Sequence, residues 1–280
     1  MPMITSIHNV GVLSLLLAAS PAAFAAPGEV ADGQYPFVVS IQQKALGPDV
    51  KTGHWCGGTL VAPDWVLTSA ECVSPFITST SSTPEKLEVI VGRTVLGDET
   101  QGRRVQIKAL HRHPFYRPID LKTGYNVALV QLATPVVGVD PVALPAADDS
   151  DVDADGHLFD SIGWNGQLPR TPDNSTVVDR LQRTQLSYLP RSQCQLPAKD
   201  GLELCVADLA HACGGSSSSW KDNLPGDPGS ALFTLVPGVG PLQVGTYSRN
   251  YSCSALSKPS LFTRLANPEI AAFISETLGR

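Results

Sequence analysis

Short apolar or alternating runs, separated by Gly, Pro, Asn and Asp, make up most of the chain after Ala26. Alternation with a period of two residues, punctuated by turn residues, predicts β-strands rather than helices. The runs lie at 37–42, 58–61, 65–69, 87–92, 105–110, 127–132, 158–164, 181–189, 231–236, 242–247 and 261–265. So many short strands in one chain are typical of an all-β sandwich or barrel.

A polar stretch at 146–157 divides these runs into two similar sets. The division suggests two barrels, the first over about residues 34–145 and the second over about residues 156–266.

The last residues predict the one clear helix of the chain, over 267–279. Asn267 is suited to the N-cap, Pro268 to the first helical position and Glu269 to the positive end of the helix dipole. The apolar face of this helix would be formed by Ile270, Phe273 and Ile274.

Residues 1–25 have the features of a secretory signal peptide. The stretch 10–19 is almost wholly apolar and too short to span a bilayer, and Ala23-Phe24-Ala25 supplies small residues for cleavage before Ala26. A buried core helix is the alternative, which Pro21 disfavours. We therefore expect an extracellular protein whose mature domain covers 26–280, and no later stretch is apolar enough for a membrane helix.

Composition narrows the class of partner. The chain has 280 residues, a formal net charge of −6 and no Lys/Arg run, which argues against nucleic acid and anionic membranes as partners.

Six cysteines in a secreted chain suggest three disulfides. Zinc binding is the competing interpretation, but the chain has no Cys-x-x-Cys or His-x-x-x-His spacing. No cofactor is expected.

From Gly33 to the C-terminal helix, a series of motifs resembles the trypsin and chymotrypsin family of serine proteases. Each motif is short, but six follow one another in the family's order: Gly33-Gln34-Tyr35-Pro36, the Trp55–Ala70 region, His113-Pro114-Phe115-Tyr116, Val127-Ala128-Leu129, Ile162-Gly163-Trp164 and Pro259–Arg264. The resemblance implies two perpendicular six-stranded antiparallel β-barrels with an active cleft between them, followed by a C-terminal helix.

The same resemblance locates the three catalytic positions, and all three are substituted. The family's histidine position is Glu71, its aspartate position is Asn126 and its serine position is Pro228. Proline offers neither a hydroxyl nor a backbone N–H, so both the nucleophile and one oxyanion-hole donor are absent. A carboxylate beside a retained aspartate would be repelled, whereas Asn126 can donate a hydrogen bond to Glu71. Drift after loss of activity and selection for a stable cleft both fit these changes.

No replacement for the triad can be identified in the sequence. Ser230 lies two residues beyond the nucleophile position. None of the histidines has an identifiable serine partner, which concerns His54, His111, His113, His157 and His211.

Other family landmarks survive only in part. The oxyanion-loop remnant is Gly226 with Asp227, and no Ile-Val-Gly-Gly start precedes Gly33, so we expect Asp227 to lack an N-terminal ammonium partner. Substitutions should narrow the specificity pocket, whose remnant is Asp222, Ser248, Arg249, Asn250 and Ser260. Leu224 replaces an expected cysteine, which favours reading Asp222 as a solvated loop aspartate.

The resemblance also implies the disulfide pairing. Cys56–Cys72 would staple the first barrel and Cys194–Cys205 would close a loop in the second. Cys213 would pair with Cys253, whose usual partner is missing.

Two further sites rest on short motifs. Asp151, Asp153 and Asp155 resemble the opening of an EF-hand calcium loop, but the twelfth position is Ile162, so a solvated acidic linker is favoured and no metal is expected. Sequons place possible glycans on Asn174 and Asn250.

Together these features predict a secreted protease homologue without peptidase activity. It would act as a decoy, an inhibitor or a cascade cofactor, by binding a secreted or host protein at the old cleft or its loops. One alternative is an active secreted serine-type endopeptidase that uses other catalytic groups. Another is an extracellular carbohydrate- or wall-binding protein, for which an aromatic content of 6% offers no obvious stacking platform.

Overall fold

The computed structural model describes residues 28–46, 49–78, 80–118, 124–150, 156–164, 177–194, 201–207, 227–250 and 259–280. The predicted signal peptide lies outside these residues. So do Asn174, Cys213, Asp222, Gly226, Cys253 and the candidate calcium ligands Asp151, Asp153 and Asp155. Asn250 is described as part of a strand, without its side chain.

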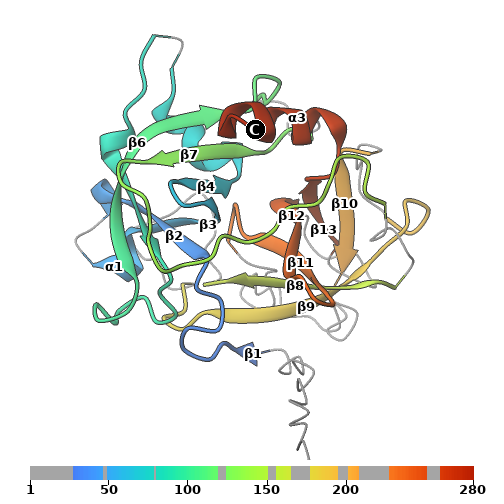
Figure 1. The fold of residues 1–280 in the computed structure, drawn as a ribbon, viewed down its shortest axis with the longest axis horizontal. Coiled ribbons are helices and arrows are strands. Elements are labelled where there is room, and N and C mark those ends of the chain that lie inside the picture. Colours follow the sequence, from blue (N-terminus) through green and yellow to red (C-terminus); the bar gives the residue numbers. More distant parts are fainter. Residues whose placement is uncertain are drawn as a thin grey trace, which may run out of the picture.

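Six antiparallel strands close the first barrel, in the order β2-β3-β4-β7-β6-β5 (Figure 1). Its strands are β2 Val38–Gln43, β3 His54–Ala62, β4 Trp65–Thr68, β5 Leu87–Val91, β6 Arg103–Arg112 and β7 Ala128–Leu132. Alternation in β6 buries Val105 and Ile107 while their polar neighbours face outward. β2 is buried along nearly its whole length, and only its last residue, Gln43, is partly exposed.

The second barrel also contains six antiparallel strands. Strands β9, β10, β13, β12, β11 and β8 follow one another, and pairing between β8 and β9 closes the ring. The bounds are β8 Leu158–Gly163, β9 Gln182–Tyr188, β10 Glu203–Ala207, β11 Ala231–Val236, β12 Gly240–Asn250 and β13 Pro259–Arg264, with the short strand β1 Gly28–Glu29 attached to β9. The predicted all-β fold of two six-stranded barrels with a C-terminal helix is confirmed.

The sequence pattern missed two strands. β10 contains the apolar run Leu204–Ala207, which is too short to be identified as a strand by its period, and all five residues of the strand are buried. β1 is only two residues long and has no period of its own. The remaining helical segments are short: α1 Val50–Gly53, α2 Ala70–Val73, η1 Lys44–Leu46, η2 Ser74–Phe76 and η3 Pro84–Lys86.

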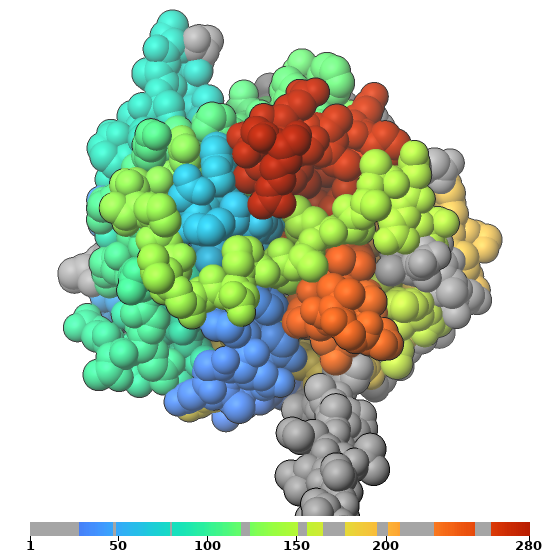
Figure 2. Space-filling view, in the orientation of Figure 1, coloured from blue at the N-terminus to red at the C-terminus, as the bar shows by residue number. Residues whose placement is uncertain are grey.

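Contacts between the barrels combine an apolar core with polar links. The larger core cluster is formed mainly by first-barrel residues and extends into the second barrel at Ile162, Trp164 and Phe233. Thr59 of β3 and Gln243 of β12 are hydrogen-bonded across the junction, with Oγ1 and Oε1 2.5 Å apart. The segment after β7 crosses from one barrel to the other below α3, as Figure 2 shows in yellow-green and red.

The C-terminal helix α3 Pro268–Leu278 begins as predicted. The Asn267 side chain accepts hydrogen bonds from the backbone N–H groups of Glu269 and Ile270, and Gly279 ends the helix in the left-handed conformation. Ile270 and Ile274 are buried in the larger core cluster. Arg280 donates a hydrogen bond to the Val61 carbonyl, 3.3 Å away, so the end of the chain is tied to the first barrel.

Replacing the cap residue Asn267 should destabilise α3. The Asn267→Ala variant should lower the free energy of unfolding by about 1 kcal/mol, because two backbone N–H groups lose their acceptor. The matched variant Asn267→Asp keeps an acceptor and should lose less. Chemical denaturation of the two variants measures the difference, and equal losses would contradict a capping role.

Candidate functional site

Glu71 and Asn126 lie together because of strand pairing. Thr68 at the end of β4 pairs with Ala128 at the start of β7, so the residues just beyond these ends are neighbours. Asn126 Nδ2 donates to Glu71 Oε1 over 3.0 Å, and Asn126 Oδ1 accepts from the Glu71 backbone N–H over 3.0 Å. The expected hydrogen bond from Asn126 to Glu71 is therefore present.

The Asn126 amide also connects the two barrels. Its Nδ2 donates a second hydrogen bond to the carbonyl of Ser248 on β12, over 3.2 Å. Asn126 is 5% exposed, so these contacts are shielded from solvent. One amide group thus fixes Glu71 relative to β12 of the second barrel.

Pro228 lies on the turn that leads into β11. The Ser230 N–H donates to the Asp227 carbonyl over 2.8 Å and closes the turn. The Pro228 carbonyl accepts from Gly57 N–H over 2.9 Å and lies 3.5 Å from Cys72 Sγ. Because Cys72 directly follows Glu71, the structure brings Pro228 to the same region as Glu71 and Asn126.

This turn requires glycine at position 229. Gly229 has φ = 83°, and a Cβ built there would lie 2.2 Å from Thr68 Oγ1 and 2.5 Å from the Gly57 carbonyl oxygen. Both distances are far below van der Waals contact. The turn therefore packs directly on the backbone of the first barrel.

A buried series of contacts, from Ser40 through His54 to Asp227, holds the start of the turn. Ser40 Oγ lies 2.6 Å from His54 Nδ1, and His54 Nε2 lies 3.0 Å from Asp227 Oδ1. Gln42 Nε2 donates to Ser40 Oγ over 2.6 Å, so the Ser40 hydroxyl is held between Gln42 and His54. The second oxygen, Asp227 Oδ2, accepts from the Trp164 backbone N–H over 2.7 Å.

The interpretation that no histidine has a serine partner was wrong for His54. Ser40 lies on β2 and His54 on β3, and their pairing is visible only once the strand register is known. The Ser40, His54 and Asp227 side chains have no measurable exposure. These contacts therefore lie in the interior of the protein and not at its surface.

The environment of Glu71 shifts its acidity. Burial raises the pKa of Glu71 to about 7, although hydrogen bonds from Asn126 and Ser69 and the charge of Arg249 act in the opposite direction. Burial, and to a smaller extent the Glu71 charge, raises the pKa of Tyr116 to about 12. The same two causes raise the pKa of Tyr247. The two phenols are therefore neutral at physiological pH.

Arg249, expected in the remnant of the specificity pocket, is held in a buried ion pair. Its Nη1 lies 2.5 Å from Glu203 Oε1 and its Nη2 lies 2.9 Å from Glu203 Oε2, a bidentate arrangement. Arg249 is 8% exposed and the Glu203 carboxylate is buried. Sequence reasoning missed Glu203 because β10 was not predicted. Ser260 on β13 is also buried and pairs with Val206 and Asn250 of the neighbouring strands.

Comparison with known proteins agrees with this architecture. A family model described as Trypsin matches residues 28–274. The chain belongs to the trypsin family. A chymotrypsin-like elastase family member 1 from Felis catus is 27% identical over 253 residues, which cover 88% of this chain and 85% of that protein.

Two disulfides expected for this family are present in the described residues. Cys56 is bonded to Cys72, with Cα atoms 6.1 Å apart, and Cys194 is bonded to Cys205 across 6.1 Å. The first disulfide anchors α2 to β3, directly beside Glu71.

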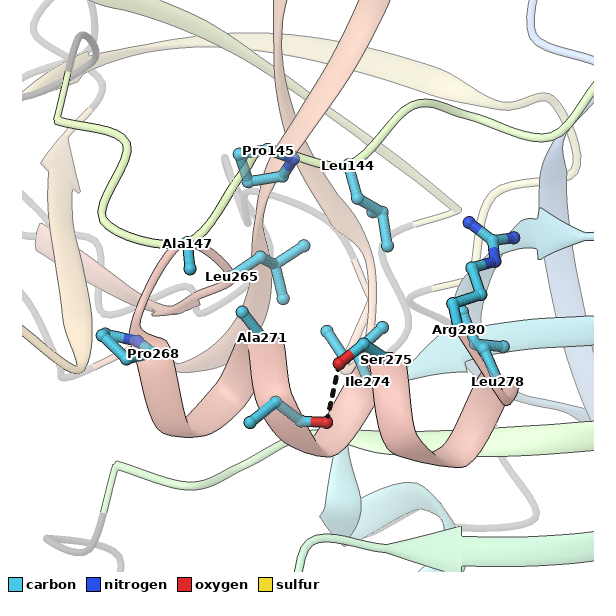
Figure 3. A pocket seen from close by; sticks show the side chains of 11 residues that line it. Leu144, Pro145, Ala147, Leu265, Pro268, Ala271, Ile274, Ser275, Leu278 and Arg280 are labelled. Atoms are coloured by element: carbon cyan, nitrogen blue, oxygen red, sulfur yellow. Dashed lines mark hydrogen bonds between the residues drawn. The ribbon is translucent and has the colours of Figure 1, made fainter.

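A cavity of about 430 Å³ lies away from Glu71, Asn126 and Pro228. It is bounded by α3 and by the segment that contains Leu144, Pro145 and Ala147 (Figure 3). Its walls are mostly apolar, and the Ser275 hydroxyl that faces it donates to the Ala272 carbonyl over 3.1 Å.

Within the described ranges, no group of three or more His, Cys, Asp or Glu side chains could hold a metal ion. Across the same residues, no helix has the length and apolar character needed to cross a membrane.

The turn at Pro228 can be tested through its glycine. Gly229→Ala should destabilise the fold by several kcal/mol, because the new Cβ adds a severe clash to the cost of a left-handed backbone. Gly238→Ala is the matched control, since Gly238 has φ = 78° but a Cβ there meets no atom within 4 Å. That control should cost only about 1–2 kcal/mol in the same denaturation measurement. Equal losses would show that the close contact is relaxed at little cost.

The acidity of Glu71 predicts a specific pH dependence of stability. Its folded-state pKa of about 7 lies above its usual value of 4.5, so the native state binds more protons between these values. Its contribution to stability is therefore complete below about pH 4.5 and is lost as the pH rises through about 7. The loss should be on the order of 2 kcal/mol, allowing for the partial exposure of the side chain.

The variant Glu71→Gln removes the titrating group and keeps an oxygen that can accept from Asn126. The difference in unfolding free energy between this variant and the parent should therefore change between pH 4.5 and pH 8, in favour of the variant at high pH. Urea denaturation across this range measures it. A difference that is independent of pH would contradict the raised pKa.

Proposed function

We propose that this trypsin-family chain is a secreted protein without peptidase activity that acts by binding another protein. The observation that supports this proposal best is the convergence of Glu71, Asn126 and Pro228. By the order of the family's motifs, these residues correspond to its catalytic positions, and they lie together at the junction of the barrels. None of them carries the hydroxyl or imidazole that the family's chemistry uses.

Pro228 removes two catalytic elements at once. Its side chain has no atom that could attack an acyl carbon. Its backbone nitrogen has no hydrogen, so it cannot stabilise the oxyanion, and loss of one such donor alone costs about 10²–10³ in rate. The Pro228 carbonyl already accepts the Gly57 N–H, so the turn is held in its present form.

Glu71 and Asn126 are suited to each other rather than to proton transfer from a serine. Glu71 accepts from the Asn126 amide, and Asn126 has a further partner at the Ser248 carbonyl. A carboxyl with a pKa of about 7 could accept a proton, but no serine hydroxyl among the described residues contacts it except Ser69, which donates over 3.4 Å. Ser69 is fully buried, so a substrate could not reach it.

The Ser40–His54–Asp227 chain does not restore activity in this proposal. An attacking hydroxyl must meet the substrate, whereas these three side chains are enclosed in the protein. Their role is to position the Asp227 carboxylate, whose Oδ1 lies 3.0 Å from His54 Nε2.

The binding role is supported by what has been retained. Both barrels, their cores and two disulfides are intact, although the three catalytic residue types are gone. A stable scaffold that carries variable loops is a common basis for protein recognition. Disulfides and the apolar segment at 10–19 support secretion.

The proposal predicts that a fluorophosphonate probe will not label the folded chain at any serine and that peptide esters will not be hydrolysed above background. An active trypsin-family peptidase serves as the positive control, and mass spectrometry locates any adduct. An adduct that depends on the native fold, together with ester hydrolysis, would overturn the proposal and favour an active peptidase.

Binding is measured separately, by capture from the natural secretion with the folded chain as bait and the reduced, unfolded chain as control. Failure to enrich any protein on the folded bait would contradict the binding role.

A further inference from the structure

The Glu71 carboxylate is only partly satisfied by the protein around it. Its Oε1 accepts from Asn126 and Ser69. No hydrogen bond or ion pair of Oε2 to another described residue is present, and Glu71 as a residue is partly exposed. One face of the carboxylate is therefore available at the junction of the barrels.

The charge of Glu71 has no dedicated counter-ion among the described groups that surround it. Arg249 on β12 acts on Glu71 through space, but its guanidinium is engaged by Glu203 at 2.5 and 2.9 Å. The other titratable groups in this environment are the phenols of Tyr116 and Tyr247, which are neutral near pH 7. Ser69 and Asn126 provide dipoles but no positive charge.

We propose that Glu71 is the anchor for a basic side chain, an arginine or a lysine, of the bound partner. This inference rests on the proposed binding function and specifies the chemistry of the partner. A guanidinium or ammonium group can supply the missing positive charge and also donate to the available oxygen. The net charge of −6 on this protein would further attract a basic segment of the partner.

Recognition at this position is coupled to pH. Burial holds a fraction of Glu71 in the protonated form up to about pH 7, and only the ionised form attracts a cation. Binding of the cation below this pH therefore releases a proton. The apparent affinity should fall about tenfold for each pH unit below 7 and level off above it.

The test uses acetyl-arginine-methylamide as the probe and the neutral isostere acetyl-citrulline-methylamide as its control. Both are titrated into the full chain at pH 5, 6, 7 and 8, and binding is followed by NMR chemical shifts. The arginine probe should bind at least tenfold more tightly than the citrulline probe at pH 8, and this preference should disappear at pH 5. The Glu71→Gln variant should lose the preference at every pH.

Glu85→Gln is the matched control variant, because Glu85 is an exposed glutamate in η3 and carries the same charge change. It should bind the arginine probe like the parent. Absence of a charge-dependent preference in the parent, or its survival in Glu71→Gln, would overturn the inference. If Glu71→Gln does not fold, the pH series on the parent alone decides the question. Peptidase activity is measured independently, so failure of this inference is distinguishable from failure of the proposed function.

Discussion

The enclosed contact between the Asp227 carboxylate and His54 is the interaction on which the junction of the barrels depends. A buried carboxylate is costly unless its charge is compensated and its oxygens are hydrogen-bonded. Here His54 of the first barrel faces one oxygen and the backbone of Trp164 binds the other. The turn that carries Pro228 is consequently attached to the first barrel, although it leads into a strand of the second.

The neighbouring contacts follow from this attachment. With the turn held against β3, the Pro228 carbonyl meets the Gly57 N–H, and Gly229 lies so close to Thr68 that no side chain fits. Tight backbone packing of this kind tolerates little displacement, since interiors are close-packed. The turn at Pro228 is therefore a structural joint between the two barrels.

Three acidic side chains near the junction differ in how they are compensated. Asp227 has His54 and Glu203 has Arg249, whereas Glu71 has only the dipoles of Asn126 and Ser69 and the distant influence of Arg249. Burial therefore raises the pKa of Glu71, because the dipoles and the distant Arg249 charge do not offset it. In the binding role that we propose, this under-compensated charge is the feature that would recognise a cation.

The sequence alone determined the features that depend on local pattern. The period of the apolar residues located eleven of the strands, and Asn267 with Pro268 located the start of α3, because strand alternation and helix capping involve residues close together in the chain. The absence of a hydroxyl and an N–H at Pro228 is likewise a property of the residue itself. Only the tertiary structure decided that His54 meets Asp227 and that Arg249 meets Glu203. Each of these pairs joins residues far apart in the sequence, and barrel closure and strand register, which no local pattern records, bring them into contact.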